Sequence, residues 1–256
     1  MKILAIGDII GKPGRNAVKE ILPGLCGKHN IDLVIGNGEN AAGGLGLTPS
    51  IAEELFDSGI DVITSGNHIW AYNEIIPCLD SELAILRPLN YPPMNPGRGY
   101  LLKNNALVVN LVGRVFMTHV DCPFRAMDQL LVEFEHKSIP IIVDFHAEAT
   151  SEKVAMGRYL DGRVSAVLGT HTHVGTIDAR ILPRGTACVT DIGMVGPTDS
   201  VIGDDPDSVI KRFLTQIPSR LAVGKGTVGF DAILVEVDQK TGKAAGIQRI
   251  QEVVHQ

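Results

Sequence analysis

Short, almost continuous runs of apolar residues, rich in isoleucine and valine, constrain this chain more than any other feature of its sequence. Seven such runs lie at residues 2–7, 32–36, 61–65, 106–112, 140–145, 164–169 and 187–191. Runs of this length without a polar face are typical of strands that are buried on both sides, as in sheets covered by helices. The sequence therefore predicts an α/β protein whose sheets lie in the interior.

Helical patterns occupy several of the segments between these predicted strands. Thr48 and Pro49 form a cap and first-position pair before a short helix. Residues 123–137 carry apolar side chains at helical spacing, and Thr150 can cap a further helix after the fifth strand. This alternation favours layered sheets with helices on their outer faces.

The C-terminal stretch has a different pattern. Residues 227–238 and 244–254 lie on either side of the turn QKTGK, a pattern that predicts a β-hairpin. No internal repeat, low-complexity tract or linker interrupts the chain. We therefore expect a single domain that spans residues 1–256.

Composition and charge exclude several classes of function. The formal net charge is -6 and no basic run stands out, which argues against long nucleic acid as a partner. No stretch approaches the roughly 20 apolar residues of a membrane span, and the N-terminal apolar run is too short for a signal peptide. Four widely spaced cysteines without a CxxC pair favour reduced thiols in a cytoplasmic protein: Cys26, Cys78, Cys122 and Cys188.

Polar side chains follow five of the predicted strands at the point where each strand ends. The carboxyl ends of strands in an α/β sheet meet at one edge, where ligands bind. We therefore expect eight polar side chains from distant parts of the chain to converge there: Asp8, Glu39, Asn40, Asn67, His68, His146, His171 and His173.

Each of these residues has an ordinary structural explanation when it is taken alone. A lone aspartate or asparagine after a strand is commonly a turn or cap residue, and a lone histidine is commonly a core residue. The set as a whole mixes carboxylate, amide and imidazole groups without cysteine, which suits Mn, Fe, Zn or Co. The ligands are too many for one tetrahedral site, whereas two metals about 3.5–4 Å apart that share a carboxylate would use them all.

The motifs GD, GEN, GNH, a lone histidine and GTHTH occur in an order that resembles the calcineurin-like metallophosphoesterases. Longer stretches are similar to the YmdB-like bacterial branch of that superfamily: IGDIIGKPGR, NGENAAGGLG, SGNHIW, RPLNYP, NLVGRVFM, DFHAEATSEK and GTHTHV. The resemblance implies a four-layer α-β-β-α fold, with two packed mixed β-sheets flanked by helices.

Two positions depart from the wider superfamily pattern. Ile10 stands where an Asp-x-His histidine is usual, and Glu39 replaces the bridging aspartate. Asn40 can restore the lost ligand through its amide oxygen. By similarity, one metal takes Asp8, Glu39, Asn40 and His173, and the other takes Glu39, Asn67, His146 and His171. His68 resembles the residue that protonates the leaving oxygen.

The resemblance implies a dinuclear phosphodiesterase that hydrolyses small nucleotide phosphoesters, with 2′,3′-cyclic nucleotides as candidate substrates. A metal-bridging hydroxide would attack phosphorus. Two divalent ions would serve as cofactors, and Fe and Mn are favoured over Mg, Zn and Co. A phosphomonoesterase and a nucleotide-binding regulatory protein with slow turnover are the alternatives. The sequence leaves open whether the protein forms a homo-oligomer.

Other polar and aromatic residues near the motifs have two interpretations. The glycine-rich stretch 41–46 is either a flexible turn or a close approach to substrate, and Trp70 either stacks on a base or packs in the core. Glu148 and Glu152 either orient His146 or merely open the next helix. Four arginines are candidates for binding phosphate through their bidentate guanidinium groups: Arg15, Arg87, Arg114 and Arg125.

Overall fold

The structure, a computed structural model, describes residues 1–134 and 139–255. Its first sheet has the strand order β12-β11-β10-β1-β2-β3, and its second has the order β4-β5-β6-β7-β9-β8. The first contains β1 (Lys2–Ile9), β2 (Leu33–Asn37), β3 (Val62–Thr64), β10 (Met194–Pro197), β11 (Val228–Asp238) and β12 (Lys243–Val254). The second contains β4 (Tyr100–Lys103), β5 (Ala106–Val112), β6 (Ile141–His146), β7 (Ala166–Thr170), β8 (Arg180–Ile181) and β9 (Ala187–Val189).

Both sheets mix parallel and antiparallel neighbours. In the first sheet β1 is parallel to β2 and β10 but antiparallel to β11. In the second sheet β5, β6, β7 and β9 run parallel, and β4 and β8 are antiparallel edges. The predicted C-terminal hairpin is confirmed, because β11 and β12 pair antiparallel along their length.

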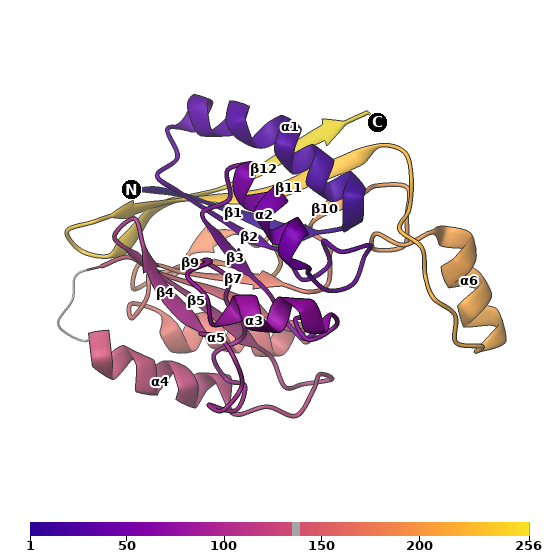
Figure 1. Cartoon of the computed structure of the whole chain (residues 1–256). Helices are drawn as coiled ribbons and strands as arrows, with labels where there is room; N and C mark the ends of the chain where they lie inside the picture. The colour runs from indigo at the N-terminus through magenta and orange to yellow at the C-terminus, as the bar shows by residue number, and fades with distance from the viewer. Residues whose placement is uncertain (135–138, 256) are drawn as a thin grey trace.

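Helices cover the outer faces of the two sheets, so the molecule has four layers (Figure 1). α1 (Gly11–His29) and α2 (Pro49–Asp57) lie beside the first sheet, together with η1 (Asn73–Ile75) and α3 (Ile76–Leu79). α4 (Pro123–Phe134) and α5 (Thr150–Leu160) lie on the second sheet. α6 (Pro206–Thr215) projects from the body at the right of the view.

The alternation of side chains along β1 explains why the sheets are apolar on both faces. Ile3 and Ala5 join the core between the two sheets, whereas Leu4 and Ile6 join the core beneath α1 and α2. β5 divides in the same way, because Val108 faces the first sheet while its neighbours pack on α4 and α5. Three apolar layers therefore require four structural layers, which confirms the predicted fold.

Two helix starts differ in detail from the sequence prediction. Thr48 is the N-cap of α2 as expected, although its side chain makes no cap hydrogen bond. Thr150 is the first residue of α5 rather than its cap, because Ala149 holds the extended cap position. The predicted helix 123–137 is present as far as Phe134, and its last three residues lie outside the described part of the chain.

Helix α1 is present in the structure but was not predicted from the sequence. It contains Pro23 in its interior, and prolines and glycines normally indicate helix ends or loops. Its buried residues nevertheless include Ala17, Val18, Leu22 and Leu25, which form one apolar face on the first sheet. Tertiary burial of this face outweighs the local cost of proline.

Within the described residues, no helix is long and apolar enough to cross a membrane.

Candidate metal centre

The eight predicted site residues belong to both sheets and come together at one edge of the molecule. Asp8 lies in β1, and short loops after β2 and β3 carry Glu39, Asn40, Asn67 and His68. From the second sheet, β6 ends in His146, and the loop after β7 carries His171 and His173. Parallel strands that point the same way in two packed sheets place these loops side by side.

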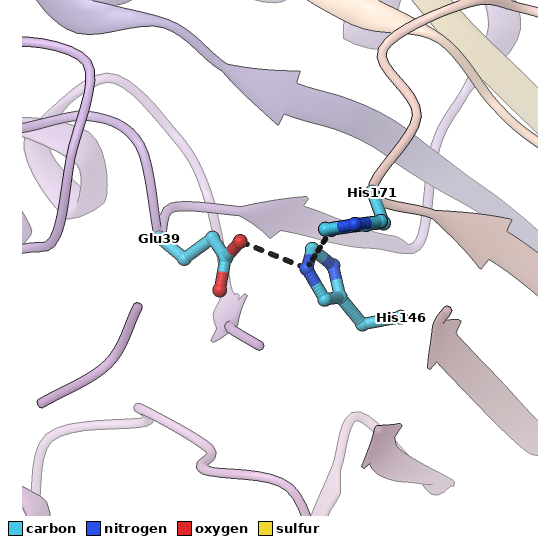
Figure 2. Close-up of side chains that lie close together, drawn as sticks. All are labelled: Glu39, His146 and His171. Atoms are coloured by element: carbon cyan, nitrogen blue, oxygen red, sulfur yellow. Dashed lines mark hydrogen bonds and ion pairs between the residues drawn. The ribbon is translucent and has the colours of Figure 1, made fainter. Parts of the chain in front are cut away.

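Three side chains converge most closely, as Figure 2 shows with Glu39 approaching from one side and two imidazoles from the other. His146 Nε2 lies 2.8 Å from Glu39 Oε1 and 3.0 Å from His171 Nδ1. The ligand atoms of all three residues lie within 4.8 Å of one another. Glu39 and His146 are fully buried, so this cluster can hold a metal ion away from bulk water.

Each imidazole has one ring nitrogen that faces the cluster and one that faces away. The hydrogen-bond partner of the second nitrogen determines whether the first carries a proton or a lone pair. His146 Nδ1 lies 3.0 Å from Thr170 Oγ1, which donates to Asp144 Oδ1. Burial raises the pKa of Asp144 to about 7. When this carboxyl is ionised, it takes the hydroxyl hydrogen of Thr170, and Thr170 can then only accept from His146, which places the imidazole proton on Nδ1 and a lone pair on Nε2. His171 Nε2 lies 3.0 Å from a carboxylate oxygen of Glu148, which favours a lone pair on Nδ1 in the same way.

Burial supports the neutral form of both imidazoles. It lowers the pKa of His146 to about 4, and burial together with the neighbouring His146 lowers the pKa of His171 to about 4. Burial also raises the pKa of Glu39, so the ionised carboxylate is disfavoured at this site without a cation. The neutral imidazoles, and the carboxylate when it is ionised, present acceptors to one another. Such a set of acceptors is repulsive alone and is stabilised by a cation.

Several buried side-chain oxygens without a hydrogen-bond partner also belong to this site. Within the described residues they are Asp8 Oδ1, Glu39 Oε1, Asn67 Oδ1 and Thr64 Oγ1. Three of these four oxygens belong to predicted metal ligands. An unsatisfied buried acceptor costs on the order of 1–3 kcal/mol, and a metal ion would remove that cost. The residues present therefore fit a metal ion.

His173 and Asp8 form a second group beside this cluster. His173 Nδ1 donates to the carbonyl of Ile202 at 2.7 Å, which leaves its Nε2 as an acceptor 3.8 Å from Asp8 Oδ1. Asp8 is fully buried, and burial raises the pKa of its carboxyl. A cation between these atoms would favour the ionised carboxylate.

Asn40 joins this second group through an unexpected atom. Its Nδ2 lies 3.1 Å from His173 Nε2, whereas its Oδ1 lies 2.9 Å from His68 Nδ1. An amide nitrogen cannot bind a metal through a lone pair, so Asn40 can become a ligand only when its amide turns over. In the orientation seen here, the residue links His173 to His68.

The loop that carries His171 and His173 is held in an uncommon backbone conformation. Both residues have positive φ angles, 103° and 64°, which cost L-residues roughly 1–2 kcal/mol each. The backbone N–H of His171 donates to Asp8 Oδ2. Thr172 donates to Asp191 Oδ2 through both its N–H and its hydroxyl, and the buried Lys153 donates to the same oxygen at 2.6 Å. Two buried carboxylates thus fix the loop.

Several supporting residues were not among the sequence candidates. Asp144, Thr170 and Lys153 hold the ligands in place, as described above. A charged residue inside the apolar run IIVDFH was a signal that could have revealed Asp144, since burying a carboxyl requires partners. Lys153 carries no such signal, because its position in α5 resembles that of any helix-surface lysine.

The two acidic residues after His146 had two interpretations, and Glu152 lies in the first turn of α5, as the second of them expects. Glu148 contacts His171, and Glu152 accepts the backbone N–H groups of Arg114 and Val115. His146 is instead oriented by Thr170. Asp191 lies in the interior beneath the loop after β7.

The structure shows how Trp70 and the glycine-rich stretch are held. Trp70 packs edge-on against Tyr91 at 5.4 Å between ring centroids and contacts the apolar core. The stretch 41–46 forms a tight turn in which Ala42 N–H donates to the carbonyl of Gly46 and Gly44 N–H donates to that of Asn40.

Gly66 has no room for a side chain. An added Cβ would lie 2.1 Å from His146 Cδ2 and 2.5 Å from Glu39 Oε2. We expect Gly66→Ala to displace both groups and to weaken metal binding by about 10–100-fold, the range typical of disturbed supporting contacts. The measurement is metal titration of chelator-treated protein. Gly24→Ala is the control, because its Cβ would meet no atom within 4 Å; equal affinities for the two variants would contradict the prediction.

The role of Asn40 is tested by removing or replacing its oxygen. We expect Asn40→Ala to lose the metal bound beside Asp8 and His173 while the metal at Glu39, His146 and His171 remains. Asn40→Asp, which offers an oxygen in either orientation, should keep both. Metal content after gel filtration is the readout. Loss of both metals in Asn40→Ala, or of neither, would show that Asn40 is not a ligand.

Comparison with known proteins agrees with this geometry. The family model of YmdB-like proteins matches residues 4–250. The chain is 48% identical over 254 residues to a 2′,3′-cyclic-nucleotide 2′-phosphodiesterase of Bacillus subtilis, covering 98% of this chain and 96% of that protein. A crystal structure of a hypothetical protein from Thermus thermophilus superimposes with a TM-score of 0.92 at 42% identity, over 99% of each chain. A phosphatase from Mycoplasma pneumoniae also gives 0.92, at 36% identity, over 99% of this chain and 93% of that one. The chain therefore belongs to the YmdB-like family.

Proposed function

We propose that this protein is a metal-dependent phosphodiesterase that hydrolyses small nucleotide phosphoesters, with 2′,3′-cyclic nucleotides as its substrates. The observation that carries the proposal is the convergence of the ligand atoms of Glu39, His146 and His171 at a site where Glu39 and His146 are fully buried. Membership of a family that includes a Bacillus subtilis 2′,3′-cyclic-nucleotide 2′-phosphodiesterase supports it.

The proposed site holds two divalent ions, iron or manganese. One would be bound by Asp8, Glu39, Asn40 and His173, and the other by Glu39, Asn67, His146 and His171. Glu39 would be shared between the two ions. Its Oε1 faces His146 Nε2, and its Oε2 accepts the backbone N–H of His68. When bound, such a pair neutralises charge on the phosphoryl group and lowers the pKa of water.

The protein residues hold the substrate site in a fixed geometry. Burial of Asp8, Glu39 and His146 excludes water from one side of the reacting phosphate. His68 lies at the rim and is the half-exposed member of the set, with 35% of its side chain accessible. Its Nδ1 faces Asn40 Oδ1, so the Nδ1 proton is held and Nε2 is left to exchange a proton with substrate.

Charges around His68 act in opposite directions on its protonation. Burial lowers the pKa of His68, and the Glu39 carboxylate partly offsets that effect. Divalent ions bound beside His68 would lower its pKa further, and a phosphate anion bound between them would offset that effect. We therefore assign to His68 the transfer of a proton to the leaving oxygen.

The number of metals is directly measurable. We expect about two equivalents per chain after loading with Mn or Fe, because seven proposed ligands exceed what a single ion binds. Elemental analysis with protein quantified by amino-acid analysis provides the number. A saturable single equivalent, unchanged at higher metal concentration, would contradict the two-metal assignment.

Replacement of His68 should matter in proportion to how poor the leaving group is. A ribose alkoxide leaves slowly without a proton, whereas nitrophenolate leaves unaided. We expect His68→Ala to lower kcat/KM about 10²–10⁴-fold on a 2′,3′-cyclic nucleotide and far less on bis-nitrophenyl phosphate. Both substrates are assayed on the same preparation.

Metal content and thermal unfolding of His68→Ala must match those of the wild type for this comparison to be valid. Equal losses on the two substrates would assign His68 a structural role. Absence of cyclic-nucleotide hydrolysis in the metal-loaded wild type would reject the proposed substrate class. Under that outcome a panel of phosphomonoesters tests the phosphomonoesterase alternative.

A further inference from the structure

The four arginines that are candidates for phosphate binding have different environments. Arg15 is paired with Glu54 and with the carbonyl of Ala41. Arg87 is buried, and its guanidinium donates to the carbonyls of Pro88 and Pro96, among others. Both are therefore structural residues.

The guanidinium groups of Arg114 and Arg125 remain available to bind an anion. Throughout residues 1–134 and 139–255, no hydrogen bond, ion pair or ring contact engages either guanidinium group. Both residues line one cavity of about 960 Å³ between the segment 87–100, the connection 113–122 and helix α4. A cavity of this volume is large enough for a small-molecule ligand such as a nucleotide.

The charge of this cavity opposes that of the whole chain. Its lining includes four arginines but two carboxylates, and one of these, Glu133, accepts the hydroxyl of Tyr100. The chain as a whole carries a formal net charge of -6. A local excess of guanidinium groups in an acidic protein favours an anion, and guanidinium is the donor best suited to phosphate.

The cavity adjoins the metal centre without sharing its ligands. None of the eight candidate site residues lines it. Gly113, next to Arg114, donates its backbone N–H to the carbonyl of His146. On another side the lining residue Tyr91 packs against Trp70, two residues after His68.

We propose that Arg114 and Arg125 form a second anion site, which binds a nucleotide phosphate that is not hydrolysed. The phosphate belongs either to the substrate itself, as a 5′-phosphate beyond the cyclic end, or to a separate small phosphate ligand. The first of these sources rests on the proposed function, whereas the anion site does not.

The first experiment uses chelator-treated protein, so that the metal centre cannot bind the probe. Inorganic phosphate is titrated into the wild type, Arg114→Gln, Arg125→Gln and Arg220→Gln. Arg220 is an exposed arginine outside the cavity and serves as the matched control. We expect the wild type and R220Q to bind phosphate equally, and R114Q and R125Q to bind it about tenfold more weakly or worse.

Two results of this titration would overturn the anion site: the same affinity in all four proteins, or no phosphate binding by the wild type. Thermal unfolding of the variants, expected to match that of R220Q, shows that folding is intact. Neither result depends on hydrolysis, so failure of the anion site and failure of the proposed function are distinguishable.

The second experiment identifies the source of the phosphate. Adenosine 2′,3′-cyclic phosphate is compared with the same molecule carrying a 5′-phosphate, using metal-loaded enzyme. A substrate phosphate predicts that the 5′-phosphate lowers KM about tenfold in the wild type and R220Q, but not in R114Q or R125Q, with kcat unchanged. Equal KM values for both compounds, with phosphate binding retained in the first experiment, assign the site to a separate phosphate ligand.

Discussion

The burial of carboxylate and imidazole groups close together at one edge of the two sheets is the constraint on which the rest of the structure depends. Glu39, His146 and Asp8 are fully buried, and Glu39 Oε1 lies 2.8 Å from His146 Nε2. Burying such groups destabilises the fold, and a bound cation would offset that cost. The surrounding residues must therefore hold the acceptors close together, and they do so through hydrogen bonds to the opposite sides of the same groups, as Thr170 does for His146.

The four-layer architecture makes this arrangement possible. Strands of both sheets end at the same edge, so the candidate ligands come from β1 and β6 and from the loops after β2, β3 and β7. The apolar layers beneath are rigid, but the loops need separate restraint. Asp191 and Lys153 supply it from below the loop that carries His171 and His173, which offsets the positive φ angles of those residues. A buried ion pair is costly by itself, and here four donors satisfy its carboxylate: Thr172 N–H, Thr172 Oγ1, Lys153 Nζ and Gly193 N–H.

The side chains of the centre differ in solvent exposure. This difference separates the groups proposed to bind metal from the group proposed to transfer a proton. The deepest groups, Glu39 and His146, offer acceptors to a cation, whereas His68 stands partly exposed above them. Asn40 lies between, with one amide atom toward His173 and the other toward His68. Reorientation of this single amide on metal binding would change the hydrogen bond that positions His68, which couples the proposed ligand set to the proposed proton donor.

The sequence by itself determined the α/β class, the C-terminal hairpin and the positions of the polar residues that gather at the strand ends. Apolar strands and their polar termini are local patterns, and the resemblance carried by the motifs indicated the four layers. Only the tertiary structure decided the rest. Helix α1 forms despite Pro23 because the first sheet buries its apolar face. Glu148 contacts His171 rather than His146, and Lys153 supports the histidine loop, because these contacts depend on how separate elements pack. Likewise, the four arginines look alike in sequence, and only the partners that surround each guanidinium distinguish Arg114 and Arg125 from Arg15 and Arg87.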